Sequence, residues 1–279
     1  MTDDLRARIE SHTATPADSP DAGAAREAAL ALLDALERGD VRAAERGADG
    51  VWRANAWVKQ GVLLALRLGR MTDQSAGPFA FFDKDTVAPQ AFTAERGVRI
   101  VPGGSSIRRG AYVASGVVCM PPMYINLGAY VDAGTMVDSH ALVGSCAQIG
   151  RDVHLSAAAQ IGGVLEPVGA APVVIEDGVF VGGGCGVYEG TVVREGAVLA
   201  AGVVLTRGSR VYDLTTETVL RAEGDRPLEI PARAVVVPGA RAVTSDFGRA
   251  HGLSVSAPVI VKIRDASTDA ATTLEEALR

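Results

Sequence analysis

A large aliphatic residue returns at every sixth position through the middle of the chain. From residue 101 to residue 211, the leading place of each six-residue unit is Val, Ile or Leu, with Cys119 as the one exception, and the phase survives an eight-residue insertion at 167–174. An amphipathic helix repeats its apolar positions every 3.6 residues, and a half-buried strand repeats them every two. A period of six instead predicts a solenoid, in which stacked units bury one another's apolar side chains.

Three six-residue units close one triangular turn, so the repeats make about six coils with the leading side chains inward. Glycine recurs at the fourth place, where a tight corner needs a positive φ. These glycines are Gly104, Gly110, Gly116, Gly128, Gly134, Gly178, Gly190, Gly196, Gly202 and Gly208. The repeats resemble those of the hexapeptide-repeat acyltransferases. That resemblance implies a mainly β fold, the left-handed parallel β-helix.

The segments that flank the repeat differ from it in pattern. Residues 1–95 are predicted to form a mostly helical cap domain that covers the first coil. Its helices are expected over about 2–11, from a cap at Ser19 to about Arg38, and around Trp57 to Gly69, with a short hairpin between the last two. The segment 79–93 is predicted to be a loop.

The solenoid domain is predicted to span 96–245. A polar excursion after Tyr212 interrupts it, and a late solenoid-like piece then returns at 230–241. The remaining residues, 246–279, are predicted to hold one strand over 253–263 and a charged tail with an acidic helix at 274–279.

Composition excludes several classes of protein. The chain has 279 residues and a net charge of −6, which argues against general binding of nucleic acid. It has no apolar run approaching the ~18 residues of a membrane span, and its start lacks the features of a signal peptide, so we expect a cytoplasmic protein. The three cysteines are odd in number and widely spaced, which predicts reduced, largely buried thiols rather than a disulfide framework or a zinc site. They are Cys119, Cys146 and Cys185.

Outward polar residues that interrupt the apolar repeat are candidates for chemistry. Asp138 stands at the second place of its unit, as either a reactive or a merely solvated carboxylate, and His140 beside it is a base or a structural partner. Gly162 and Gly163 would let a ligand approach the backbone closely. Glu166 lies at the root of the only insertion, where it could accept hydrogen bonds from an amine or anchor the loop.

Basic side chains gather near the two ends of the solenoid, although the chain as a whole is acidic. Arginine can hold a carboxylate or a phosphate through two parallel hydrogen bonds, and a surface salt bridge is the alternative for each one. The residues concerned are Arg99, Arg108, Arg109, Arg207, Arg210 and Lys262.

Residues 120–167 resemble the signature of the 2,3,4,5-tetrahydropyridine-2,6-dicarboxylate N-succinyltransferase family. The resemblance extends upstream through GVRIVP at 97–102 and into the cap through VWRANAWVKQGVLLALRL and FFDK. It extends downstream through IEDGVFVGG, EGTVV and VIVK, so that it covers nearly the whole chain.

The resemblance implies transfer of a succinyl group from succinyl-CoA, as a co-substrate, to the amino group of ring-opened tetrahydrodipicolinate in lysine and diaminopimelate biosynthesis. It implies that Asp138 is catalytic, that Arg99 binds the substrate, and that Glu166 lies near the substrate's amino group. Glu189 matches a further glutamate of the family and is predicted to be catalytic. We expect cofactor contacts at Gly162, Gly163 and Lys262, and no metal.

One departure from the family pattern concerns catalysis. The resemblance implies Arg-Ser-Glu in the coil after the insertion, with a catalytic glutamate, where this chain has Gly184, Cys185 and Gly186. Either the chain is a variant in which Asp138, Glu166 or Glu189 acts as the base, or the acceptor differs. The alternative activity is an acetyl-CoA-dependent N-acetyltransferase that acts on the same or another amino acceptor.

The resemblance also implies a homotrimer, with the donor's arm in the groove between neighbouring solenoids and active sites built from two chains. Other activities known on this solenoid fit the sequence less well. A zinc site of three imidazoles is disfavoured because the coils contain only His140 and His154. A sugar nucleotidyltransferase would need a larger N-terminal domain than 1–95, and an ice-binding surface would need a regular ladder of threonines.

Overall fold

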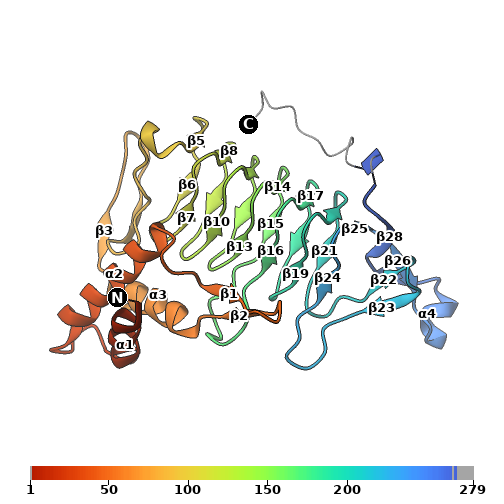
Figure 1. Ribbon diagram of the computed structural model, residues 1–279, viewed down its shortest axis with the longest axis horizontal. Coiled ribbons are helices and arrows are strands. Elements are labelled where there is room, and N and C mark those ends of the chain that lie inside the picture. Colours follow the sequence, from red (N-terminus) through yellow and green to blue (C-terminus); the bar gives the residue numbers. More distant parts are fainter. Residues whose placement is uncertain (1, 266, 269–279) are drawn as a thin grey trace.

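The coils stack in a row between a helical cap and a C-terminal lobe of mostly antiparallel strands (Figure 1). The computed structural model describes residues 2–265 and 267–268. Three parallel sheets run along the stack, one on each side of a triangular section. The fold is therefore the mainly β, left-handed parallel β-helix that the repeats imply. The division of the chain at 95 and 245 stays a prediction.

Three helices form the cap, namely α1 Thr2–His12, α2 Ala22–Glu37 and α3 Ala56–Leu68. Their facing sides are apolar and buried, which is the pattern predicted for an amphipathic bundle. The predicted start of the second helix is wrong, because α2 begins after Asp21. The Ser19 hydroxyl accepts the backbone N–H of Asp21 at 3.2 Å, so it stabilises the turn before the helix rather than the helix end.

Two antiparallel hairpins belong to the same region. Strands β1 Ala44–Arg46 and β2 Trp52–Ala54 form the hairpin predicted between the second and third helices. Strands β3 Met71–Asp73 and β4 Phe82–Lys84 form a second hairpin, so the prediction that 79–93 is a loop is wrong at β4. A short 3₁₀ helix, η1 Ala94–Arg96, leads into the coils.

Each side of the coil carries one sheet, and the sides are named here in chain order. The first side holds β5 Arg99–Ile100, β8 Val118–Cys119, β11 Met136–Val137, β14 His154–Leu155, β17 Phe180–Val181 and β20 Val198–Leu199. The second side holds β6 Ser106–Ile107, β9 Tyr124–Ile125, β12 Leu142–Val143, β15 Gln160–Ile161, β18 Gly186–Val187 and β21 Val204–Leu205. The third side holds β7 Tyr112–Val113, β10 Tyr130–Val131, β13 Gln148–Ile149, β16 Val174–Ile175, β19 Val192–Val193 and β24 Glu229–Ile230.

The inward residue of each strand stacks on its counterparts, which explains the period of six. Val131, for example, pairs with Val113 below and Ile149 above, and all three are buried. The insertion leaves this ladder intact, because β16 still pairs with β13 in register. The eight extra residues therefore form an external loop.

The fourth place of the unit does require the left-handed backbone region. Nine of the ten glycines predicted for it have a positive φ, and Gly208 is the exception. His140, Cys146, Asp152 and Ala158 take the same place with φ between 52° and 65°. The structure thus gives His140 a corner role in the backbone.

Both ends of the predicted repeat are wrong in detail. Ile100, not Val101, pairs with Cys119, because the first coil contains one extra residue in the Gly103 and Gly104 turn. At the other end Ile230, rather than Val211, stacks on Val193. The chain leaves the stack after β21, and the later solenoid-like piece fills the vacant place.

The C-terminal lobe extends the sheet of the first side. It consists of β22 Val211–Asp213, β23 Thr218–Leu220, β25 Ala234–Val237, β26 Ala240–Ala242, α4 Asp246–Ala250, β27 Ser254–Ser256 and β28 Val259–Ile263. The single strand predicted near its end is therefore two strands. The acidic helix predicted at 274–279 lies outside the described residues.

The three thiols are free and buried, as the sequence predicts. Burial raises the pKa of Cys119 and of Cys146 to about 12, and it also raises the pKa of Cys185. Over residues 2–265 and 267–268, none of the helices is long and apolar enough to cross a membrane.

Candidate active site

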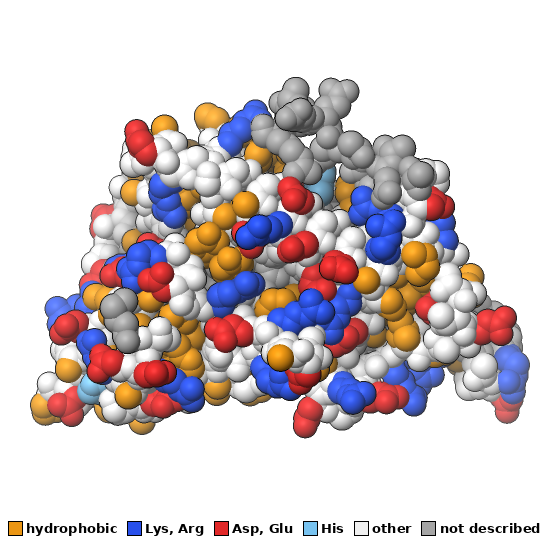
Figure 2. Space-filling view, in the orientation of Figure 1, with side chains coloured by type: hydrophobic (Ala, Val, Ile, Leu, Met, Phe, Trp, Pro, Cys, Tyr) orange, Lys and Arg blue, Asp and Glu red, His pale blue; other side chains and the backbone are white. Residues whose placement is uncertain are grey.

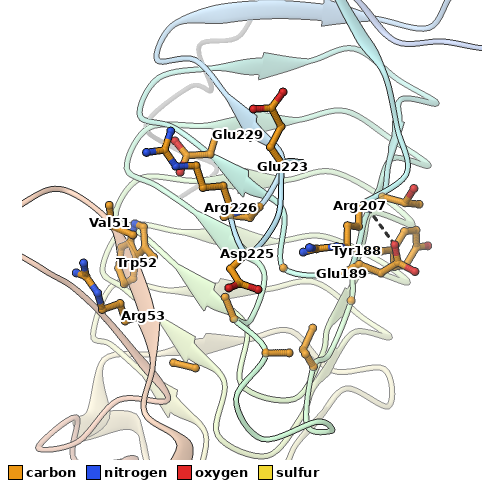
Figure 3. Close-up of a pocket in the computed structure, with 18 of the residues that line it drawn as sticks. Val51, Trp52, Arg53, Tyr188, Glu189, Arg207, Glu223, Asp225, Arg226 and Glu229 are labelled. Atoms are coloured by element: carbon orange, nitrogen blue, oxygen red, sulfur yellow. Dashed lines mark hydrogen bonds between the residues drawn. The ribbon is translucent and has the colours of Figure 1, made fainter. Parts of the chain in front are cut away.

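A cleft of about 1850 Å³ opens beside the coils, where segments distant in the sequence meet (Figure 3). Its walls come from the β1–β2 hairpin at 49–54, the root and first part of the insertion loop at 162–171, the corner at 188–190 and the excursion at 219–229. Basic and acidic side chains are interspersed over the face of the molecule that carries the hairpin (Figure 2). The cleft is therefore polar and suited to a charged ligand.

The insertion loop is held tightly against the coils at its root. The backbone N–H of Gly162 donates to the carbonyl of Val187 at 2.8 Å, and that of Val164 donates to Ser145 at 3.1 Å. A β-carbon added at Gly163 would lie 2.5 Å from the backbone nitrogen of Ser145. Gly162 and Gly163 do line the cleft, but packing between neighbouring coils already requires small residues there.

Lys59 fixes the far part of the loop to the cap. Its side chain is fully buried in α3, and its ammonium group donates to the carbonyl of Ala170. Burial lowers the pKa of Lys59, with a small opposing effect from Cys146. The loop wall of the cleft is thus attached to a helix far away in the sequence.

Replacing Lys59 by Met should release this attachment while keeping the apolar volume of the side chain. We expect the Michaelis constant for the ligand of the cleft to rise severalfold, because the loss of one charge-assisted hydrogen bond of ~1.5–3 kcal/mol loosens the loop. Limited proteolysis within 167–173 should also become faster. Unchanged proteolysis and binding in the Met variant would show that Lys59 does not hold the loop.

A buried ion-pair network joins the hairpin to the coils behind the cleft. Glu176, only 7% exposed, accepts the indole N–H of Trp52 and one N–H of Arg194, both at 2.8 Å. Arg194 also donates to Glu229 at 2.7 Å and to the carbonyl of Gly50 at 3.1 Å. Burial alone would raise the pKa of Glu176, but the hydrogen bonds from Trp52 and Arg194 hold it below its usual value.

Glu189 lies at the corner after β18 and organises the opposite wall. Its carboxylate accepts the backbone N–H of Arg207 at 2.9 Å, and the Arg207 guanidinium donates to the carbonyl of Gly224. The excursion that roofs the cleft is therefore tied to the coil through Arg207. The carboxylate of Glu189 is nevertheless exposed and lines the cleft.

Besides Arg194, the cleft contains four arginines that could contact an anion, and two of them already have a carboxylate partner. Arg53 pairs with Asp49, and Arg221 pairs with Glu223. Within the described part of the chain, Arg207 and Arg226 form no ion pair with a carboxylate. Arg226 was missed in the sequence because it stands in an irregular polar excursion that no repeat aligns with the coils.

Four of the seven predicted site residues line this one cleft, and three do not. Those in the cleft are Gly162, Gly163, Glu166 and Glu189. Asp138 lies on the opposite edge of the second side, at the corner between β11 and β12, where its carboxylate accepts the N–H of Ser139 at 2.7 Å. Within one chain, therefore, the two predicted catalytic carboxylates stand on different corners.

The two predicted basic contacts also lie elsewhere. Arg99 is exposed in β5, at the cap end of the first side. Lys262 is in β28 and pairs with Asp265 at 3.0 Å. Arg108 and Arg109 are engaged by Asp83 and Asp34, so they join the coils to the cap.

No group of three or more His, Cys, Asp or Glu side chains among the described residues is arranged to hold a metal.

Comparison with known proteins identifies two segments of the chain. The family model described as tetrahydrodipicolinate N-succinyltransferase, N-terminal, matches residues 4–68, and the hexapeptide repeat of succinyl-transferase matches residues 172–207. The 2,3,4,5-tetrahydropyridine-2,6-dicarboxylate N-succinyltransferase of Bradyrhizobium diazoefficiens is 45% identical over 116 residues, which cover 38% of this chain and 40% of that protein. This chain is a relative of these succinyltransferases.

The similarity to other members is of the same kind. The enzyme of the same name from Cereibacter sphaeroides is 45% identical over 137 residues, which cover 45% of this chain and 47% of its own length. The matches thus span less than half of the relatives. A solved structure, a putative 2,3,4,5-tetrahydropyridine-2-carboxylate N-succinyltransferase from Campylobacter jejuni, has a TM-score of 0.50 at 15% identity, covering 84% of this chain and 62% of that one. At that identity it supports the fold alone.

Proposed function

We propose that the protein transfers a succinyl group from succinyl-CoA to the amino group of ring-opened tetrahydrodipicolinate, a step of lysine and diaminopimelate biosynthesis. One observation carries the proposal: the two segments that match succinyltransferase families are also two walls of the cleft. The segment 4–68 contains the β1–β2 hairpin, and the segment 172–207 contains Glu189, Arg194 and Arg207.

The reaction needs a base and no covalent enzyme intermediate. The amine of the acceptor attacks the thioester carbon, the new C–N bond forms, and the C–S bond breaks to release the CoA thiolate. An ammonium ion cannot attack, so a carboxylate must take a proton from the nitrogen, and the thiolate is protonated as it leaves. Asp138 and Glu189 are the carboxylates proposed for this proton transfer, with Glu166 near the amine.

Asp138 and Glu189 flank the second side of the coil from opposite corners, so a single chain does not bring them together. We infer that the site forms between subunits of a homotrimer, with Asp138 from one chain facing the cleft of its neighbour. Arg99 and Lys262, which lie outside the cleft of their own chain, would then serve a neighbouring cleft. Free, buried thiols are consistent with a reducing, cytoplasmic location.

The charges of the cleft favour a succinyl donor over an acetyl donor. Arg207 and Arg226 have no carboxylate partner among the described residues, and arginine binds carboxylates and phosphates through paired hydrogen bonds. The succinyl group carries a carboxylate that an acetyl group lacks. Acetyl-CoA remains the alternative donor, since the phosphates of CoA could occupy both arginines.

Release of free CoA thiol tests the proposed reaction. The purified protein is mixed with tetrahydrodipicolinate and either succinyl-CoA or acetyl-CoA, and omission of the acceptor serves as the control. We expect thiol release with succinyl-CoA that depends on the acceptor. Release that does not depend on the acceptor would indicate thioester hydrolysis, and no release with either donor would reject the proposal.

A further inference from the structure

Tyr188 lines the cleft immediately before Glu189, and its ring folds back over its own coil. A β-carbon added at Gly186 would lie 2.5 Å from Cε2 of the ring and 2.9 Å from the hydroxyl oxygen. A β-carbon added at Gly162, on the neighbouring coil, would lie 2.7 Å from Cδ1. The ring therefore occupies a slot that exists because two neighbouring residues have no side chain.

Backbone conformation does not explain these two glycines. Most corner glycines of the coils have a positive φ, but Gly186 is in strand β18 and neither it nor Gly162 has one. An alanine could adopt either backbone conformation, but its methyl group would meet the ring of Tyr188. The two glycines thus hold the aromatic ring in one position. Gly186 is also where the chain departs from the glutamate that the family resemblance implies.

The hydroxyl of Tyr188 is available to a ligand. Buried or half-buried tyrosines usually find a hydrogen-bond partner. Among the residues that the structure describes, none donates to or accepts from this hydroxyl, although the ring is half-buried. A tyrosine hydroxyl carries one O–H group, so it can donate a hydrogen bond to a ligand oxygen.

We propose that the Tyr188 hydroxyl donates a hydrogen bond to the thioester oxygen of the bound acyl donor. This inference rests on the proposed function. When the amine attacks the carbonyl carbon, the C=O π electrons move onto oxygen, and the hydroxyl stabilises that oxyanion. Collapse of this tetrahedral intermediate restores the C=O bond and expels the CoA thiolate. A hydroxyl whose ring is already fixed stabilises this charge without reorganising, while the carboxylate base of the proposed function takes the proton from nitrogen.

Two substitutions separate the hydroxyl from the ring position. Tyr188→Phe removes only the O–H group, whereas Gly186→Ala keeps it but displaces the ring. We expect kcat to fall ~10²-fold in Tyr188→Phe, as for the loss of one oxyanion donor, with the KM for succinyl-CoA unchanged. Gly186→Ala should also lower kcat, because the displaced ring no longer places the hydroxyl at the thioester oxygen.

Matched controls are available in the cap and the first coils. Tyr112→Phe removes a hydroxyl from a ring that stacks on Tyr130 away from the cleft. Gly23→Ala adds a methyl group where nothing lies within 4 Å. Both should keep the wild-type kcat, and neither should lower the unfolding temperature, since Gly23 lies in α2 and alanine is the better helix former.

The outcomes distinguish this inference from the proposed function. Wild-type kcat in Tyr188→Phe, or a change confined to KM, would reject an oxyanion contact. It would leave the proposed succinyltransferase activity unaffected. A wild-type protein that releases no thiol would reject the proposed function and this inference with it. An equal loss of kcat and of thermal stability in Tyr188→Phe would assign Tyr188 a packing role and also overturn the proposal.

Discussion

Replacing Asp138 by Asn is expected to lower the turnover number by ~10²–10⁴-fold, because an amide cannot take the proton that the attacking amine must lose. The fold should be unaffected. Asp138 is half-buried, and the one described contact of its carboxylate is the N–H of Ser139 at 2.7 Å, which an amide oxygen accepts equally well. Initial rates of CoA release and a thermal unfolding curve on the same preparation measure the two effects.

Asp132 provides a closely matched control. It stands at the same place of the preceding repeat unit, and its carboxylate accepts the N–H of Ala133 at 2.8 Å. It differs from Asp138 in one exposed ion pair, with Arg151 at 3.5 Å, which should contribute little to stability. It lies, however, at the corner between the third and first sides. Asp132→Asn should therefore retain activity. If Asp138→Asn turned over at the wild-type rate, Asp138 would not be the base, and equal losses in both variants would point to corner geometry instead.

Replacing Arg194 by Met is expected to lower the free energy of unfolding by ~3–5 kcal/mol, because it removes the close, buried cationic partner of the Glu176 carboxylate. The remaining cation, Arg46, is half exposed and lies 3.7 Å away. The hairpin wall should lose its attachment as well, since Arg194 also donates to the Gly50 carbonyl. Urea unfolding followed by tryptophan fluorescence measures the loss, and CoA release should fall with it.

Two further variants test the cause of that loss. Arg221→Met removes an exposed pair in the same cleft, whose side chains are 62% and 66% exposed, and should cost no more than ~1 kcal/mol. Adding Glu176→Gln to Arg194→Met removes the buried charge that has lost its close partner and should recover part of the stability. If Arg221→Met lowered the free energy of unfolding as much as Arg194→Met, burial of the ion pair would not be the cause of the loss.

The pKa of Glu176 gives this network a pH dependence. Its folded value is held below the usual one, so the carboxylate contributes stability above the unfolded pKa of ~4.3, and this stability is lost as the pH falls through the folded value.

The coils could be predicted from the sequence because one inward aliphatic per six residues is both the sequence pattern and the physical rule of the fold. The ends could not. Which residue turns inward in the first coil depends on how the Gly103 and Gly104 turn absorbs one extra residue, and either Ile100 or Val101 satisfies the pattern. The β3–β4 hairpin escaped prediction because its strands bury no apolar face, and Phe82 is 65% exposed.

The site was predictable where it follows from the repeat register. Glu189 and Gly163 stand at corresponding places of neighbouring coils, and the insertion marks Glu166, so these residues converge. The walls supplied by other regions were not predictable. Trp52 and Glu176 are 124 residues apart in sequence, and only the docking of the hairpin on the coils brings them together. The slot that holds Tyr188 likewise becomes visible only when the coils are stacked.

The most direct test of the central claim is a competition between donors. Succinyl-CoA and acetyl-CoA are supplied at equal concentrations with tetrahydrodipicolinate, and mass spectrometry identifies the N-acyl product formed in the initial phase, which gives the ratio of the two kcat/KM values. We predict that the N-succinyl product exceeds the N-acetyl product by at least ~10-fold, because a site that binds the donor's carboxylate rejects a donor that lacks it. A predominantly acetylated product, or no product from either donor, would contradict the account.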